Sequence, residues 1–183
     1  MKTTNRSPVS PLVQSLPPSG IRRFFDLVSE MDDVISLGVG EPDFVTPWRI
    51  REAAIYSLER GHTMYTSNYG LLELREAIAE DLAKRHSLLY DPRSEILVTV
   101  GVSEAMDLVM RALLSPGDEV IIPEPCYVSY KPCTILAGGK PVVIPTRVED
   151  GFRPTAAQIE AAITPKSKLL ILSYPNNPTG ATL

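Results

Sequence analysis

The stretch LLILSYPNNPTG, residues 169–180, joins an apolar run to a turn and sets the interpretation of the rest of the chain. The segment from Lys168 to Ser173 predicts a strand that is buried on both faces. Proline, asparagine and glycine follow it, and these residue types form turns. Asn177 is therefore either a turn residue before a proline or a side-chain amide that donates a hydrogen bond to the phenolate oxygen of a ligand.

Further apolar runs upstream repeat this pattern and alternate with helical segments. The strands are predicted at 96–100, 119–122 and 141–144, and the helices at 103–114, 127–137 and 156–163. Thr155 is the expected N-cap of the last helix. Strands that are apolar on both faces and alternate with helices are typical of a parallel sheet covered on both sides. The predicted fold class is therefore α/β, with a mostly parallel sheet and helices on both faces.

The first part of the chain predicts an arm and shorter elements. Residues 1–20 are polar and rich in proline, which is typical of a loose arm. Periodicity predicts a helix at 21–30, a strand at 34–37, and helices at about 47–60 and 71–87. Thr46 is the expected N-cap of the helix at about 47–60, with Pro47 at its first position.

Composition excludes several classes of partner. The 183 residues carry a net charge of −4 and no cluster of Lys or Arg, so nucleic acid is not an expected partner. The apolar runs are too short to span a membrane, and no apolar segment of a secretory signal follows the first residues. Cys126 and Cys133 fit neither a redox pair nor a zinc site, so we expect reduced thiols in the cytoplasm.

The segments that follow the predicted strands hold the candidate site residues, because open parallel sheets bind ligands at the carboxyl ends of their strands. Gly101, Val102 and Ser103 lie between a strand and a helix, where free amides and the helix dipole favour a phosphate group. The alternative is an ordinary tight turn with Ser103 as the N-cap. Tyr127 could stack on a flat heterocycle, or it could be an aromatic residue of the core or its rim.

Two more strings lie nearer the amino terminus. GVGEPDF, residues 38–44, brackets a strand end with glycines, and Gly40 would let a ligand approach the backbone closely. YTSNYG, residues 65–70, begins with Tyr65 and precedes a helix. Each string could also be a plain loop.

Taken together, the strings resemble those of the class I/II, fold-type I pyridoxal-phosphate aminotransferases, in particular the aspartate, aromatic and broad-specificity branch. The resemblance runs from about Ser19 to the end of the chain and rests on GEPDF (40–44), YTxxxG (65–70), GVS (101–103), SPGDEV (115–120), PxY (125–127) and NPTG (177–180). It implies an arm and small-domain segment at residues 1–35. Residues 36–183 would then be the first part of the large cofactor-binding domain.

The resemblance also implies roles for the strings around the ring and the phosphate of pyridoxal 5′-phosphate. Val102 and Ser103, following Gly101, would hold the phosphate through backbone amides and a hydroxyl. Tyr127 would stack on the pyridine ring. Asn177 would donate to the phenolic oxygen of the ring and lie near the substrate carboxylate. The Asn177–Pro178 peptide bond is expected to be cis, and Glu124–Pro125 is a weaker candidate.

Substrates and assembly follow from the same resemblance. The expected activity moves an amino group from an amino acid to a 2-oxo acid. The amide of Gly40 would meet the substrate carboxylate. Tyr65 would reach the phosphate in the neighbouring subunit, which implies a homodimer.

The lysine that binds the cofactor covalently in the family has no counterpart in this sequence. The six lysines lie in the arm, on helices or at the amino ends of strands, and none has the surrounding motif. The prediction is therefore an amino-terminal portion of an aminotransferase with no catalytic residue of its own. A lyase of the same fold remains open, and so does a non-catalytic binding or assembly module that pairs with another chain.

Overall fold

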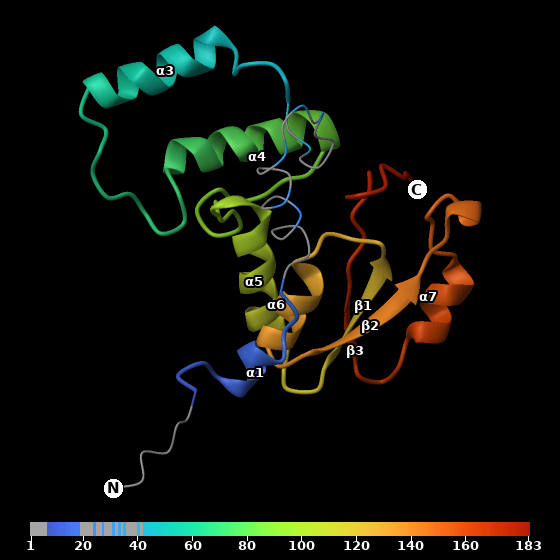
Figure 1. Ribbon diagram of the computed structural model, residues 1–183. Helices are drawn as coiled ribbons and strands as arrows, with labels where there is room; N and C mark the ends of the chain where they lie inside the picture. The colour runs from blue at the N-terminus through green and yellow to red at the C-terminus, as the bar shows by residue number, and fades with distance from the viewer. Residues whose placement is uncertain are drawn as a thin grey trace, which may run out of the picture. The chain divides into compact units, whose positions relative to one another are not determined.

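The computed structural model describes residues 7–18, 24, 27, 31, 33, 35, 40 and 42–183 (Figure 1). The chain divides into two compact units. The first, here called the sheet unit, comprises Met1–Ser19 and Val100–Leu183, and the second, the helical unit, comprises Gly20–Thr99. Apart from a few single residues, the elements predicted at 21–30 and 34–37 lie outside the described residues. The domain boundary predicted near residue 35 falls in the same stretch and stays a prediction.

The sheet unit contains three parallel strands in the order β2-β1-β3. They are β1 (Glu119–Glu124), β2 (Lys140–Pro145) and β3 (Ser167–Leu170). The central strand, β1, is buried along almost its whole length because its apolar side chains face covered layers on both sides. The predicted α/β class and parallel sheet are confirmed.

The boundaries of all three strands differ from the prediction, those of β2 by one residue at each end. Pro123 was expected to end β1, but pairing continues to Glu124, whose carbonyl accepts a 2.8 Å hydrogen bond from the N–H of Thr146. A proline removes one donor from the ladder and leaves its acceptors in place. β3 ends at Leu170, three residues earlier than predicted, with one further bond from the N–H of Ile171 to the carbonyl of Ile121.

The helices of the sheet unit lie on both faces of the sheet. They are α5 (Gly101–Leu113), α6 (Tyr130–Leu136) and α7 (Ala156–Ala162), with α1 (Pro11–Gln14) against α6 and a 3-10 turn at Val148–Asp150. The chain moves from β1 out to β2 through α6 and returns past β1 to β3 through α7. Right-handed crossovers in opposite directions place these two helices on opposite faces, as Figure 1 shows.

The core of the sheet unit forms where α5 and α6 cover β1. Met110, Val120 and Ile122 have no exposed surface, and Tyr130 packs beside them. Gly139, just before β2, lets the backbone pack closely against Leu114, because a Cβ at this position would lie 2.8 Å from Leu114 Cδ1. The side of β1 that carries the core is therefore packed without spare volume.

The capping predictions had mixed outcomes. Thr155 is the N-cap of α7, as predicted, and it also forms a full capping box with Gln158. In the helical unit, α3 (Trp48–Glu59) has Pro47 as its N-cap, so the assignment of that role to Thr46 was wrong. Extended backbone suits an N-cap, and Pro47 has φ −50° and ψ 140°.

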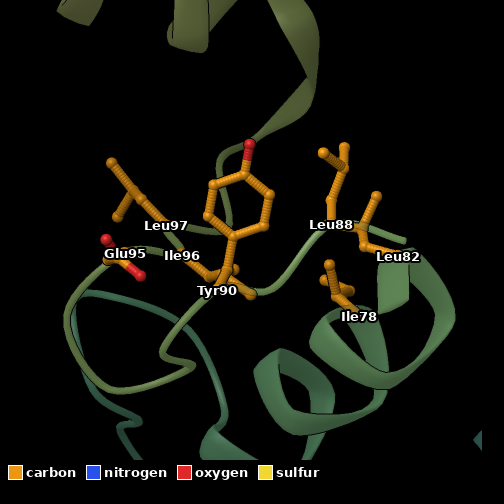
Figure 2. A pocket seen from close by; sticks show the side chains of 7 residues that line it. All are labelled: Ile78, Leu82, Leu88, Tyr90, Glu95, Ile96 and Leu97. Carbon is orange, nitrogen blue, oxygen red and sulfur yellow. The ribbon is translucent and has the colours of Figure 1, made fainter. Parts of the chain in front are cut away.

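The helical unit also contains α4 (Leu72–His86), which matches the helix predicted at 71–87. The strand predicted at 96–100 was wrong, because this run forms no ladder within the described part of the chain. The N–H of Val98 donates to the carbonyl of Tyr69 at 3.0 Å. An apolar run becomes a strand only with a neighbour to pair with. Here the run and α4 instead line an open groove of about 390 Å³ (Figure 2), bordered by Ile78, Leu82, Leu88, Tyr90, Glu95, Ile96 and Leu97.

Candidate functional site

Three segments of the sheet unit carry the residues that the sequence singled out. They are the amino end of α5, the turn after β1 and the turn that follows β3. Hydrogen bonds join each segment to the next. The carboxyl edge of the sheet is therefore a connected set of turns rather than three independent loops.

The amino end of α5 presents backbone amides and a hydroxyl. Gly101 begins the helix with φ +73°, a conformation that a residue with a side chain rarely adopts. Val102 and Ser103 follow in the exposed first turn, and the carboxylate of Glu104 accepts from the N–H of Val100. Ser103 is the third helical residue, so the alternative that made it the N-cap was wrong. The first amides of a helix have no intrahelical acceptor, and they face an anion favourably.

Tyr127 lies in the turn after β1 and reaches the amino end of α5. Its hydroxyl is 3.0 Å from Ser103 Oγ, and its half-buried ring meets Tyr130 edge to face at a centroid distance of 5.7 Å. The hydroxyls of Ser103 and Ser129 lower the pKa of Tyr127 because they stabilise its phenolate. The prediction that α6 begins at Tyr127 was wrong. The helix begins at Tyr130, so the tyrosine at 127 is held by the turn.

The turn after β3 separates two adjacent asparagines. Asn177 is exposed, whereas Asn176 is 7% exposed and makes hydrogen bonds through both ends of its side chain. The Asn177–Pro178 and Glu124–Pro125 bonds are cis, which confirms both predictions, and a third cis bond at Tyr174–Pro175 was not predicted.

Sequence reasoning missed Asn176 and Tyr174. The Tyr174 hydroxyl donates to the carbonyl of Phe152 at 3.2 Å, and burial raises the pKa of this tyrosine. The doublet of asparagines was visible in the sequence. Which member is buried depends on the neighbouring turn at Pro125, and that turn is distant along the chain.

Gly40 and Tyr65 belong to the helical unit. A Cβ added at Gly40 would meet no atom within 4 Å, and the side chain of Tyr65 is fully exposed. Both backbone and ring are therefore accessible. Their contribution to a site shared with the sheet unit stays a prediction.

Three of the described lysines form ion pairs. Lys131, near the carboxyl end of β1, forms an ion pair with Glu124. Lys140, at the opposite end of the sheet, pairs with Glu119 at 2.9 Å, and Lys84 pairs with Glu80 along α4 at 2.5 Å. That none of the lysines is catalytic stays a prediction.

The described part of the chain contains neither a candidate metal site nor a candidate membrane-spanning helix. Its His, Cys, Asp and Glu side chains form no group of three that could hold a metal ion. None of its helices combines the length and the apolar character needed to cross a membrane.

The amino end of α5, Tyr127 and the turn of asparagines and prolines after β3 meet at the carboxyl edge of the sheet. Residues 32–183 match the aminotransferase class I and II family, and the chain belongs to this family. Enzymes of the family depend on pyridoxal 5′-phosphate.

Relatives named for different amino acid substrates have similar sequence identity to this chain. The chain is 51% identical over 166 residues to an aspartate aminotransferase of Pyrococcus abyssi, covering 91% of this chain and 43% of the relative. It is 46% identical over 175 residues to aromatic-amino-acid aminotransferase 2 of Thermococcus litoralis, covering 96% and 45%. The chain thus spans less than half the length of these relatives.

Solved structures agree with this assignment. The aspartate aminotransferase of Rhizobium meliloti superposes with a TM-score of 0.89 at 38% identity, over 97% of this chain and 45% of that one. The fold is that of a fold-type I aminotransferase.

Proposed function

We propose that the polypeptide containing this chain is a pyridoxal-phosphate-dependent aminotransferase that moves an amino group from an amino acid to a 2-oxo acid. The observation that carries the proposal is the 3.0 Å contact between Ser103 Oγ and Tyr127 OH. It puts a ring of the kind that stacks on a heterocycle beside a helix end of the kind that binds a phosphate. Family membership supports the same conclusion.

The amino end of α5 fits a phosphate dianion. Gly101 leaves the approach open, since a Cβ there would meet nothing within 4 Å. The amides of Val102 and Ser103 and the Ser103 hydroxyl would hold the phosphate oxygens, helped by the helix dipole. A bound phosphate and the Tyr127 hydroxyl would both contact Ser103. The ring of Tyr127 would therefore lie directly beside the phosphate.

The turns after β1 and β3 fit the ring of the cofactor. Tyr127 is supported edge-on by Tyr130, so one face of its ring can remain open for stacking. The exposed amide of Asn177 would donate to the phenolic oxygen of the cofactor. When bound, the cofactor supplies a ring that withdraws electrons and makes the α-proton of an amino acid acidic. The role of these residues is to hold that ring flat and to tune it.

We assign no covalent role to the lysines of this chain. Among the described lysines of the sheet unit, Lys131 lies near the carboxyl end of β1, and its charge is paired with Glu124. An ammonium engaged by a carboxylate has no lone pair to offer to a cofactor aldehyde. The lysine that the reaction requires would come from outside these 183 residues.

Substrate, assembly and compartment complete the proposal. Gly40 would offer its amide to the substrate carboxylate, and the exposed Tyr65 would reach the phosphate held by a neighbouring subunit in a homodimer. The two relatives described above are named as an aspartate aminotransferase and an aromatic-amino-acid aminotransferase. We therefore expect an acidic or aromatic amino donor. With reduced cysteines and a soluble composition, the cytoplasm is the proposed compartment.

The direct test uses the product of the complete gene. It is purified with pyridoxal phosphate, and one sample is reduced with borohydride and weighed intact. A second, unreduced sample that carries the cofactor is assayed for transfer from aspartate and phenylalanine to 2-oxoglutarate. One cofactor adduct per polypeptide with transfer activity supports the proposal. No adduct and no transfer would leave a binding or assembly module as the better account.

A charge variant tests the phosphate site separately. Ser103→Asp puts a carboxylate where the phosphate would lie and is expected to weaken cofactor binding by at least about 10-fold. Ser115→Asp, just beyond the opposite end of α5, adds the same charge away from the site and is the matched control. Equal effects of the two variants would contradict the placement of the phosphate.

A further inference from the structure

Asn176 occupies a position that the proposed chemistry does not require and that the fold nevertheless buries. Its Oδ1 accepts two hydrogen bonds from Thr179, from the N–H at 3.2 Å and from Oγ1 at 3.0 Å. Its backbone N–H donates to the carbonyl of Ala181 at 2.8 Å, and its carbonyl accepts from the N–H of Gly180 at 2.8 Å. The backbone and one end of the side chain thus close the turn on both sides of Asn177.

The other end of the same side chain leaves the turn. Asn176 Nδ2 donates to the carbonyl of Pro125 at 3.3 Å, across 51 positions of sequence. Pro125 lies two residues before Tyr127, in the turn after β1. One carboxamide therefore joins the turn that presents Asn177 to the turn that presents Tyr127.

We propose that Asn176 is a positioning residue that sets the placement of Asn177 relative to Tyr127. The inference rests on the proposed function, because it concerns how the amide donor and the stacking ring are held in register around one cofactor ring. A carboxamide suits both tasks because it accepts at one end and donates at the other. Its burial at 7% exposure keeps water from replacing either contact.

An isosteric variant separates the two tasks. Asn176→Asp keeps an oxygen that accepts from Thr179 and loses the donor to the Pro125 carbonyl, so the turn remains and the link between turns is broken. Thr179→Val is the matched control, because it removes the two bonds that the Thr179 hydroxyl makes within the turn, to Asn176 Oδ1 and from the N–H of Ala181, and leaves the link intact. Asn177→Ala removes the proposed donor itself.

The experiment uses the complete gene product loaded with pyridoxal phosphate and follows the pH titration of the absorption band of the bound cofactor. Equilibrium affinity for the cofactor, kcat and KM are measured beside it. The loss of Asn177 should shift the titration midpoint upward, because a donor to the phenolic oxygen favours its ionised form. Asn176→Asp should shift the midpoint in the same direction and lower kcat by roughly 3- to 10-fold with KM nearly unchanged. The thermal midpoint of the apoprotein should also fall, because a buried carboxylate then faces the Pro125 carbonyl.

The outcomes separate the two proposals. A shifted midpoint in Asn177→Ala and Asn176→Asp, with Thr179→Val near wild type, supports the positioning role. A wild-type midpoint and kcat in Asn176→Asp, with Asn177→Ala altered, overturns the inference and leaves the proposed function standing. A wild-type midpoint in Asn177→Ala overturns the proposed role of Asn177, and with it the inference. If Asn176→Asp only lowers the thermal midpoint, Asn176 is a structural residue and the inference fails.

Discussion

The sheet unit and the helical unit of this chain are ordered by different means. In the sheet unit, β1 is covered on both faces, and Met110, Val120 and Ile122 have no exposed surface. In the helical unit, the described part of α3 has no buried residue, and the buried residue of α4 is an arginine. One unit is held by an apolar core, and the other by hydrogen bonds around a charged group.

The proposed site residues are divided between these two units. Ser103, Tyr127 and Asn177 are mounted on the packed unit, where turns are tied to a rigid sheet. Gly40 and Tyr65 lie on the unit with the exposed apolar helix, and Leu58 of α3 is 64% exposed. A site assembled from both would combine fixed groups with groups that depend on further contacts.

The largest expected effect comes from the core of the sheet unit. Ile122→Ala removes a fully buried side chain from the central strand, and we expect a loss of about 2–5 kcal/mol in the free energy of unfolding. Leu58→Ala, on the exposed helix, should change it by less than about 0.5 kcal/mol. Urea denaturation measures both. A large loss in Leu58→Ala would show that another surface covers α3 and would weaken the contrast.

The second prediction concerns the arginine that orders the helical unit. Arg75 is 6% exposed, donates to the carbonyls of Gly70, Pro92 and Arg93, and lies 5.8 Å from the ring centroid of Tyr69. Its removal leaves these part-buried carbonyls without that donor.

Arg75→Ala should therefore lower the free energy of unfolding by about 2–3 kcal/mol, and Arg75→Lys by less, since an ammonium keeps the charge but not the fork of donors. Hydrogen exchange should accelerate locally, in residues 66–70 and 91–95. Unchanged exchange there in Arg75→Ala would show that the loop bearing Tyr65 is held by something else.

A smaller effect is expected at the cap of α7. Thr155→Ala removes the side chain that accepts from the N–H of Gln158, and a loss of about 1 kcal/mol is expected. Thr155→Ser keeps the hydroxyl and should recover most of it. Thermal unfolding of the three proteins decides this, and equal midpoints for the alanine and serine variants would contradict the capping role.

Local rules predicted a large part of this structure from sequence. The parallel sheet followed from apolar runs alternating with helices, and the N-cap role of Thr155 followed from its place before an apolar helical stretch. The cis bond before Pro178 came from the resemblance rather than from any local rule. The residue types at the carboxyl edge pointed to Ser103 and Tyr127, and the structure brings their hydroxyls together.

The misses depended on distant partners. The apolar run at 96–100 has strand character, but pairing requires a neighbour that no local pattern supplies. The burial of Asn176, and not Asn177, is decided by a carbonyl 51 positions away. Tyr127 has helix-compatible neighbours, and the turn after β1 excludes it from α6. Sequence periodicity does not encode such contacts.

The smallest predicted effect lies at the amino end of the sheet and depends on pH. Glu119 is 6% exposed and accepts from Thr164 Oγ1 at 2.6 Å and from Lys140 Nζ at 2.9 Å. These two donors, that of Thr164 first, hold the pKa of Glu119 below its ordinary value of about 4.5. A carboxylate with a lowered folded-state pKa stabilises the protein above its unfolded pKa, and this contribution is lost as the pH falls through the folded value.

Glu119→Gln should therefore be slightly less stable than wild type at pH 7, because the amide oxygen still accepts from Thr164 and most of the ammonium of Lys140 is exposed. The difference should shrink as the pH is lowered from about 4.5 through the folded pKa, since protonation gives the wild type a neutral side chain as well. Urea midpoints at a series of pH values measure it, with the exposed Glu149→Gln as the control. A difference that stays constant with pH would mean that Glu119 acts through shape rather than charge, and that the sheet unit is ordered by its apolar core alone.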